Sequence, residues 1–171
     1  MMILIACFAQ LFFQINYSDK QTVEILEEPA MVVLSINEEP PYLWPLKSTY
    51  RHITSSFGKR ISPFTKQAQH HKGIDIKASA GTLIIAPAEA TVLEVGEDDR
   101  NGKYIILRHD EIYQTKYCHL SETAVVNGQH IDAGNEIGKV GNSGLSTRPH
   151  LHYEVIKNGE NVDPKEYLTQ T

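Results

Sequence analysis

The chain has little cysteine: only Cys7 and Cys118 occur among its 171 residues. Because no Cys-x-x-Cys pair exists, zinc ribbons and thioredoxin-like redox chemistry are excluded. We expect no disulfide between the two cysteines, since Cys7 lies in an apolar N-terminal segment. Basic runs are also lacking and the net charge is -5, so nucleic acid is not an expected partner.

Long hydrophobic runs are lacking as well. Residues 1–15 are apolar but interrupted by Gln10 and Gln14, and a transmembrane helix needs about 20 apolar residues. The segment is similar to the apolar region of a signal peptide, although it has neither a basic start nor a clear cleavage site. Leu4-Ile5-Ala6-Cys7 also resembles a lipid-attachment signal, and a first strand or helix of the domain is the third interpretation. We expect residues 1–20 to be a signal peptide or membrane-anchor segment.

The remaining chain divides into a short extension and one domain. Residues 21–48 are acidic and contain several prolines, with one expected strand at Met31–Ile36. This stretch is too short to bury its own core, so it is interpreted as a linker or a packed N-terminal extension. Residues 49–168 are expected to form the single functional domain.

Short β-branched runs separated by turn signals predict that this domain is mainly β. Asn101-Gly102, Asn127-Gly128 and Asn158-Gly159 are typical of tight turns between strands. Helices are expected only near Ser121–Val126 and Pro164–Leu168. The expected strands are Thr82–Ile85, Ala90–Val95, Tyr104–Arg108, Gln114–Cys118, Glu136–Val140 and Leu151–Ile156. This spacing favours a sandwich or barrel.

Two histidines at positions i and i+2, His150 and His152, lie in the last of these strands. Side chains two apart point to the same face of a strand. Histidine is the commonest metal ligand, so this pair is either a metal ligand with a catalytic neighbour or two solvated surface residues.

A second cluster contains His71 and Asp75. In an extended strand these residues would be roughly 13 Å apart, so binding a common ion requires a bend, and Gly73 permits one. A catalytic zinc site uses three protein ligands and keeps one position open. His71, Asp75 and one of His150 and His152 would supply such a set, with the other histidine acting on water or substrate. The spacing does not decide which histidine has which role.

Three blocks together resemble the signature of the lysostaphin-type (LytM-like) zinc metallopeptidases. They are His71-x-Gly73-Ile74-Asp75, Tyr117-Cys118-His119-Leu120, and Gly141-Asn142-Ser143-Gly144 leading to His150-Leu151-His152. The resemblance covers residues 52 to 168. It implies a β-rich barrel-sandwich hybrid (duplicated hybrid motif) of antiparallel strands with an open groove.

The resemblance also implies roles for individual residues. Zn²⁺ would be held by His71, Asp75 and His152, and the catalytic residues would be His119 and His150. The family has no His-Glu-x-x-His motif, and neither has this chain.

The implied activity is a zinc-dependent endopeptidase that hydrolyses peptide cross-links or stem peptides of bacterial peptidoglycan. We then expect a protein exported to the cell envelope or secreted, with possible membrane anchoring through the N-terminus, and a monomer. The alternative is a non-catalytic zinc-binding regulator that activates another cell-wall hydrolase.

Several neighbouring residues carry expectations of their own. Arg148 stands where the family commonly has glycine, so we expect an additional charge near the groove. Cys118 is expected to be a small buried residue, Leu151 a core residue, and Arg60 either a substrate-binding or a structural residue. The groove wall is expected to include Asn142, Ser143, Ser146 and Thr147.

Overall fold

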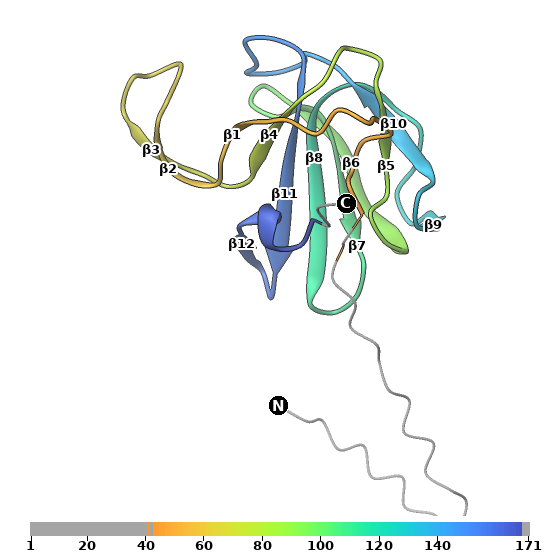
Figure 1. Ribbon diagram of the computed structural model, residues 1–171. Helices are drawn as coiled ribbons and strands as arrows, with labels where there is room; N and C mark the ends of the chain where they lie inside the picture. Colours follow the sequence, from red (N-terminus) through yellow and green to blue (C-terminus); the bar gives the residue numbers. More distant parts are fainter. Residues whose placement is uncertain (1–40, 42, 169–171) are drawn as a thin grey trace, which may run out of the picture. The chain divides into compact units, whose positions relative to one another are not determined.

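The computed structural model describes residue 41 and residues 43–168, and β-strands dominate this part of the chain (Figure 1). The expected signal or anchor segment 1–20, and the extension 21–48 up to residue 40, including the strand expected at Met31–Ile36, lie outside the described residues. Among the described residues, no helix has the length and apolar character needed to cross a membrane.

Ten strands form one antiparallel sheet and two more form a separate hairpin. The strands are β1 (Ile53–Ser55), β2 (Gly58–Ile61), β3 (Ala68–His71), β4 (Ile74–Lys77), β5 (Leu83–Ile85), β6 (Ala90–Asp98), β7 (Gly102–Arg108), β8 (Tyr113–Thr123), β9 (His130–Ile131), β10 (Glu136–Val140), β11 (His150–Lys157) and β12 (Glu160–Val162), followed by the short 3-10 helix η1 (Pro164–Glu166).

The main sheet has the order β1-β4-β11-β8-β7-β6-β9, with β10 between β8 and β5, and β12 beside β11. The path ends at β1 and β9, and these strands do not pair with each other in the described part of the chain, so the sheet is not closed into a barrel. The hairpin of β2 and β3 extends away from the sheet (Figure 1). The expectation of a mainly antiparallel β fold is confirmed.

The core lies on one face of the strands that later carry the site. Ile74 and Ile76 of β4, and Leu151 and Tyr153 of β11, are completely buried, at 0% exposure. Alternation with period two therefore sends the residues between them to the opposite face. Trp44 joins the same apolar cluster, so the packed part of the chain begins before residue 49.

The sequence correctly predicted most long strands and one hairpin turn. Asn158 and Gly159 join β11 to β12 with φ values of 51° and 81°, as a two-residue hairpin of the Asn-Gly type requires. The helix expected at Ser121–Val126 is wrong, because β8 continues to Thr123 and pairs with β10. The helix expected at Pro164–Leu168 is reduced to the three residues of η1.

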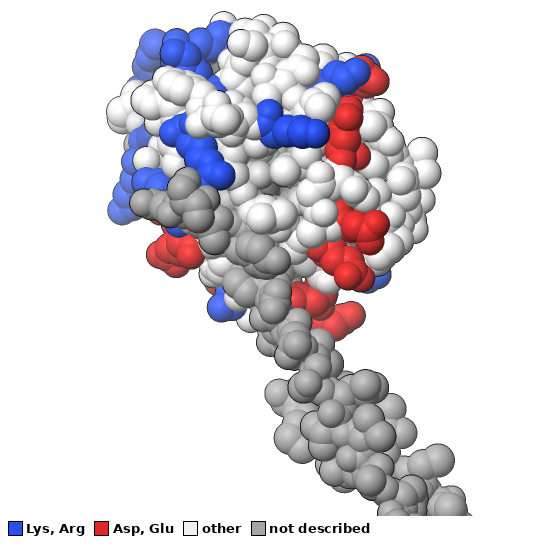
Figure 2. Space-filling model, turned by 45° about the vertical axis from the view of Figure 1, so that its right-hand side comes forward, with Lys and Arg blue, Asp and Glu red and all other residues white. Residues whose placement is uncertain are grey.

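Charge is unevenly distributed over the surface. On the face drawn in Figure 2, Lys and Arg side chains gather mostly on the left and upper parts, whereas Asp and Glu side chains follow the right-hand side. The net charge of -5 therefore does not describe the local charge at any one site.

Candidate metal centre

The pairing of β4 with β11 places Asp75 beside His152. These two residues are direct partners in the antiparallel register, and His150 is the partner of Lys77. Since the neighbours of Asp75 and His152 point into the core, both side chains project from the other face. Directly opposite side chains on one face lie about 5 Å apart at Cβ, which is close enough for both to contact one ion.

His71 reaches the same place through a bend. It ends β3, and the chain bends at Gly73 before β4 begins. A Cβ atom at position 73 would lie 2.2 Å from the backbone oxygen of Tyr153, so only glycine permits this close approach to β11. The bend that the sequence required at Gly73 is present.

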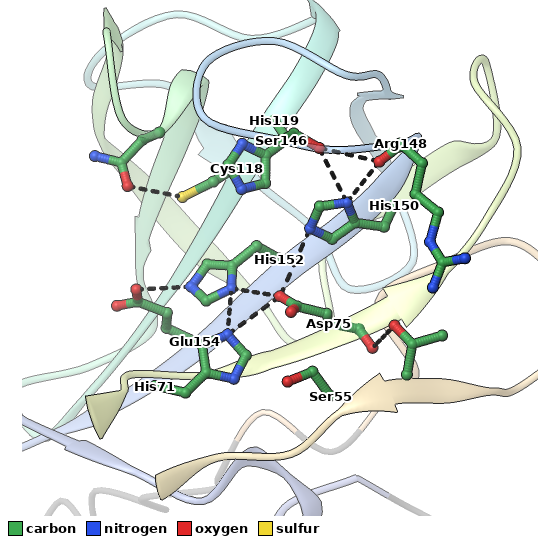
Figure 3. A network of polar contacts seen from close by, with 12 residues as sticks. Ser55, His71, Asp75, Cys118, His119, Ser146, Arg148, His150, His152 and Glu154 are labelled. Atoms are coloured by element: carbon green, nitrogen blue, oxygen red, sulfur yellow. Dashed lines mark hydrogen bonds and ion pairs between the residues drawn. The ribbon is translucent and has the colours of Figure 1, made fainter. Parts of the chain in front are cut away.

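Three donor atoms form a nearly equilateral triangle in Figure 3. His71 Nε2 is 3.1 Å from His152 Nδ1 and 3.2 Å from Asp75 Oδ1, and His152 Nδ1 is 2.9 Å from Asp75 Oδ1. Donors at three corners of a tetrahedron, each about 2.0–2.1 Å from its centre, are about 3.3 Å apart. The triangle therefore fits a tetrahedral divalent metal ion with a fourth position open.

Hydrogen bonds on the outer side of the two rings fix which nitrogens face the triangle. His71 Nδ1 donates to the backbone oxygen of Ser56 at 2.8 Å, and His152 Nε2 donates to Glu154 Oε1 at 3.0 Å. A neutral imidazole that donates from one nitrogen has a lone pair on the other. Two lone pairs and a carboxylate oxygen then face one another, so a cation at the centre is required.

In the absence of a metal, protonation of His152 would supply that charge. Burial would lower the pKa of His152, but its hydrogen bonds with Asp75 and Glu154 raise the pKa above its ordinary value. Because a metal ligand must be deprotonated, metal binding releases this proton.

Asp75 remains ionised at this position. Burial alone would raise the pKa of its carboxyl, but hydrogen bonds with His152 and His71 hold the pKa well below its usual range. Its second oxygen accepts a hydrogen bond from Arg60 at 2.9 Å, and Arg60 also donates to Ser55 Oγ at 2.6 Å. Arg60 is thus a residue that orients the Asp75 carboxylate.

A β-bulge in β8 brings His119 to the same face. Tyr117 pairs with Ile105 and Leu120 pairs with Lys103, so β8 advances three residues where β7 advances two. His119 has φ of 65°, a left-handed conformation that is uncommon for residues other than glycine. Without the bulge His119 would share the core face of Tyr117; with it, His119 lines the groove and Leu120 enters the core.

His119 and His150 lie beside the triangle as a second pair, with ring centroids 4.9 Å apart (Figure 3). His119 Nδ1 donates to the backbone oxygen of Ser143 at 2.9 Å, and His150 Nδ1 donates to that of Arg148 at 2.8 Å. Both rings therefore have a lone pair on Nε2 when neutral. His150 Nε2 is 3.6 Å from Asp75 Oδ1.

His119 is neutral at physiological pH. Burial and, to a smaller extent, the neighbouring His150 and His152 together lower its pKa to about 4, although the hydrogen bond to Ser143 opposes this shift. A neutral imidazole with a free nitrogen is able to accept a proton from water or substrate.

A groove of about 600 Å³ runs over this cluster. Its lining includes His71, Asp75, His119, His150 and His152, so the structure brings all five sequence-predicted site residues to one place. Ser146 and Thr147 also line the groove, as expected. Ser143 does not line the groove, but its backbone oxygen accepts the hydrogen bond from His119 Nδ1.

Cys118 and Arg148 are close in sequence to the two histidines His119 and His150. Cys118 is fully buried, as expected, and burial raises the pKa of its thiol, so it is not a reactive group. The side chain of Arg148 is directed away from the three donors, beyond His150 (Figure 3). Arg148 lines a second hollow next to the groove and not the groove itself, so the expected charge does not lie over the three donors.

Sequence reasoning missed Glu154. Its carboxylate accepts a hydrogen bond from His152 Nε2, the ring nitrogen on the side away from the donor triangle. A signal was available, because Glu154 follows His152 by two residues and therefore shares its face. The orienting contact of Arg60 had no such signal, since β2 lies on a separate hairpin.

The sequence profile of "Peptidase family M23" matches residues 69–164. The chain belongs to this family. It is 38% identical over 117 residues to the peptidoglycan DD-endopeptidase ShyC of Vibrio cholerae, covering 68% of this chain and 27% of that protein. The resemblance to the lysostaphin-type peptidases is thereby confirmed at the level of the M23 family.

Solved structures agree with this M23 assignment. A zinc-containing peptidase from Vibrio cholerae superposes with a TM-score of 0.67 at 33% identity, over 73% of this chain and 38% of that chain. The catalytic domain of the antimicrobial peptidase lysostaphin from Staphylococcus simulans gives a TM-score of 0.63 at 27% identity, over 68% and 91% of the two chains. The chain spans about a quarter of the length of the curated relatives that it matches first, 26% and 27%.

Proposed function

We propose that this protein is a zinc-dependent endopeptidase that hydrolyses peptide cross-links or stem peptides of bacterial peptidoglycan. The observation that carries the proposal is the triangle of His71, Asp75 and His152 beside the histidine pair His119 and His150 in an open groove. The family membership and the DD-endopeptidase relative support the same reaction and substrate class.

In this proposal His71, Asp75 and His152 hold the zinc ion. When bound, zinc lowers the pKa of a coordinated water toward about 7 and polarises a peptide carbonyl. His119 and His150 flank the open side of the donors, where their Nε2 lone pairs accept a proton and orient the attacking water. Once protonated, either ring donates a hydrogen bond to the developing oxyanion or a proton to the leaving amine.

Location and partners follow from the substrate. Peptidoglycan lies outside the cytoplasmic membrane, so the proposal includes export to the cell envelope, through an N-terminal signal or anchor in residues 1–20. We propose a monomer, because one chain supplies all five residues of the site.

The test is digestion of purified sacculi, with mass analysis of the released peptides. We expect zinc to bind with one ion per chain, and His71→Ala to lose both zinc and activity. His150→Ala should keep zinc and lose activity. His130→Ala is the matched control, since His130 is exposed and lies outside the groove. Full activity in His71→Ala or His150→Ala contradicts the assignment.

The same experiment separates the alternative function. A regulator would bind zinc and release no peptides from any sacculus, yet would stimulate a second cell-wall hydrolase added to the assay. His119 and His150 beside the donors favour the enzyme, because proton transfer needs such side chains and a protein that only binds a partner does not.

A further inference from the structure

A second hollow begins where the groove ends. It has a volume of about 400 Å³, and His150 lines both this hollow and the groove. A peptide cut beside His150 and continuing in an extended form advances about 3.3 Å per residue. The residue next to the cleaved bond, or the one after it, would therefore reach this second hollow.

The second hollow carries positive charge only. Its charged lining residues are Lys77 and Arg148, and no Asp or Glu lines it. Lys77 is the strand partner of His150, and Arg148 precedes His150 by two residues. The two cations therefore approach His150 from the neighbouring strand β4 and from the segment just before β11.

Neither cation is neutralised by the protein. Within residues 43–168, no ion pair involves Lys77 or Arg148, and the Lys77 ammonium instead lies over the Tyr50 ring at 5.8 Å from its centroid. The backbone oxygen of Arg148 accepts a hydrogen bond from His150 Nδ1, which fixes the backbone at this position. The Arg148 side chain itself is exposed. Hydroxyl groups of Ser79 and Thr82 line the same hollow.

We propose that Lys77 and Arg148 form a carboxylate-binding subsite that selects peptides with a free carboxylate close to the cleaved bond. The proposal rests on the proposed endopeptidase function and specifies its substrate. Guanidinium and ammonium groups donate charge-assisted hydrogen bonds to carboxylates, and arginine does so with two parallel bonds. An amide in place of the carboxylate would lose this interaction.

The experiment compares one cross-linked peptide in a carboxylate form and a carboxamide form, with the zinc-loaded full chain. We expect kcat/KM to be about 10-fold higher for the carboxylate form, the gain of one charge-assisted hydrogen bond. The double variant Lys77→Met with Arg148→Gln should lose this preference while keeping its zinc and its thermal unfolding temperature. The charge-preserving pair Lys77→Arg with Arg148→Lys should retain part of it.

A binding measurement keeps the test independent of catalysis. In the His119→Asn variant, which supplies a residue tolerant of positive φ, calorimetry should give the same preference for the carboxylate form. If the wild type cleaves neither peptide, the endopeptidase function is wrong. The binding preference measured by calorimetry still shows whether the carboxylate-binding subsite exists.

The matched control removes the same two charges elsewhere, through Lys59→Met with Arg108→Gln, two exposed residues outside both hollows. This variant should keep the preference. Equal binding of both peptides by the unmodified subsite overturns the proposal, as does preference retained after loss of Lys77 and Arg148. Displacement of both peptides alike by a polyglycerol phosphate would assign the hollow to an anionic wall polymer, and would also overturn it.

Discussion

Replacing Glu154 by glutamine is expected to weaken zinc binding without removing a zinc ligand. The Glu154 carboxylate is only 7% exposed, and both of its oxygens are used. One accepts from His152 Nε2 at 3.0 Å and the other from Asn161 Nδ2 at 2.8 Å. Burial would raise the pKa of Glu154, but the hydrogen bond from His152 lowers it below its ordinary value.

A glutamine is able to satisfy only one of these two donors. If its oxygen faces His152, its amide group opposes the Asn161 amide, and a buried donor is left unsatisfied. If its amide faces His152, the ring must accept at Nε2, and its proton then occupies Nδ1, the nitrogen that faces the metal. Changes of this kind behind a ligand histidine cost about 10- to 100-fold in metal affinity, which is about 1.4–2.8 kcal/mol.

The assay is competition for zinc against a chromophoric chelator at pH 7.5. Glu122→Gln is the control, because Glu122 is an exposed carboxylate that is paired with Lys139 and does not line the groove. Adding Asn161→Asp to Glu154→Gln restores an acceptor for the glutamine amide and should recover part of the affinity. A zinc affinity of Glu154→Gln within twofold of the wild type would refute the reasoning.

Three further predictions concern the fold and the metal. Gly73→Ala should lower the free energy of unfolding by about 2–3 kcal/mol in urea denaturation, because its Cβ would meet the Tyr153 backbone oxygen at 2.2 Å; an unchanged midpoint would contradict this. Burial lowers the pKa of His109, partly opposed by its hydrogen bond to the Glu89 carbonyl. The unfolded chain therefore binds more protons below about pH 6.5, and stability should fall from pH 7 to pH 5. His109→Gln should show a shallower fall than the wild type when both are measured with chelator, and parallel curves would exclude the effect. Removing zinc should lower the unfolding temperature, by an amount equivalent to about 2.7 kcal/mol at a zinc concentration 100 times Kd; calorimetric scans with and without chelator measure it.

The sequence correctly predicted those features of the site and fold that depend on residues adjacent in the chain. The alternation of period two put His150 and His152 on one face and Leu151 in the core. The Asn158-Gly159 pair predicted its hairpin because both residues tolerate positive φ. Gly73 was correctly expected at a bend, since no other residue fits so close to β11.

The sequence did not predict the register in which distant strands pair. The register that sets Asp75 opposite His152 joins residues 77 positions apart, and residue pattern alone left open which histidine meets the carboxylate. In the structure His152 faces both His71 and Asp75, whereas His150 lies two residue pairs further along, opposite Lys77.

The His119 position shows most clearly what only the tertiary structure decided. Regular alternation along β8 would send His119 into the core, and a bulge in its pairing with β7 turns it outward. The bulge lies where the other partner of β8 changes from β11 to β10. In the same way, the fixed backbone of Arg148 beside His150 directs its side chain to the second hollow. Sequence thus determined which side chains are available and their local faces, because those follow from adjacent residues. The packed sheet determined which of them meet, because strand register and bulges depend on partners far away in the chain.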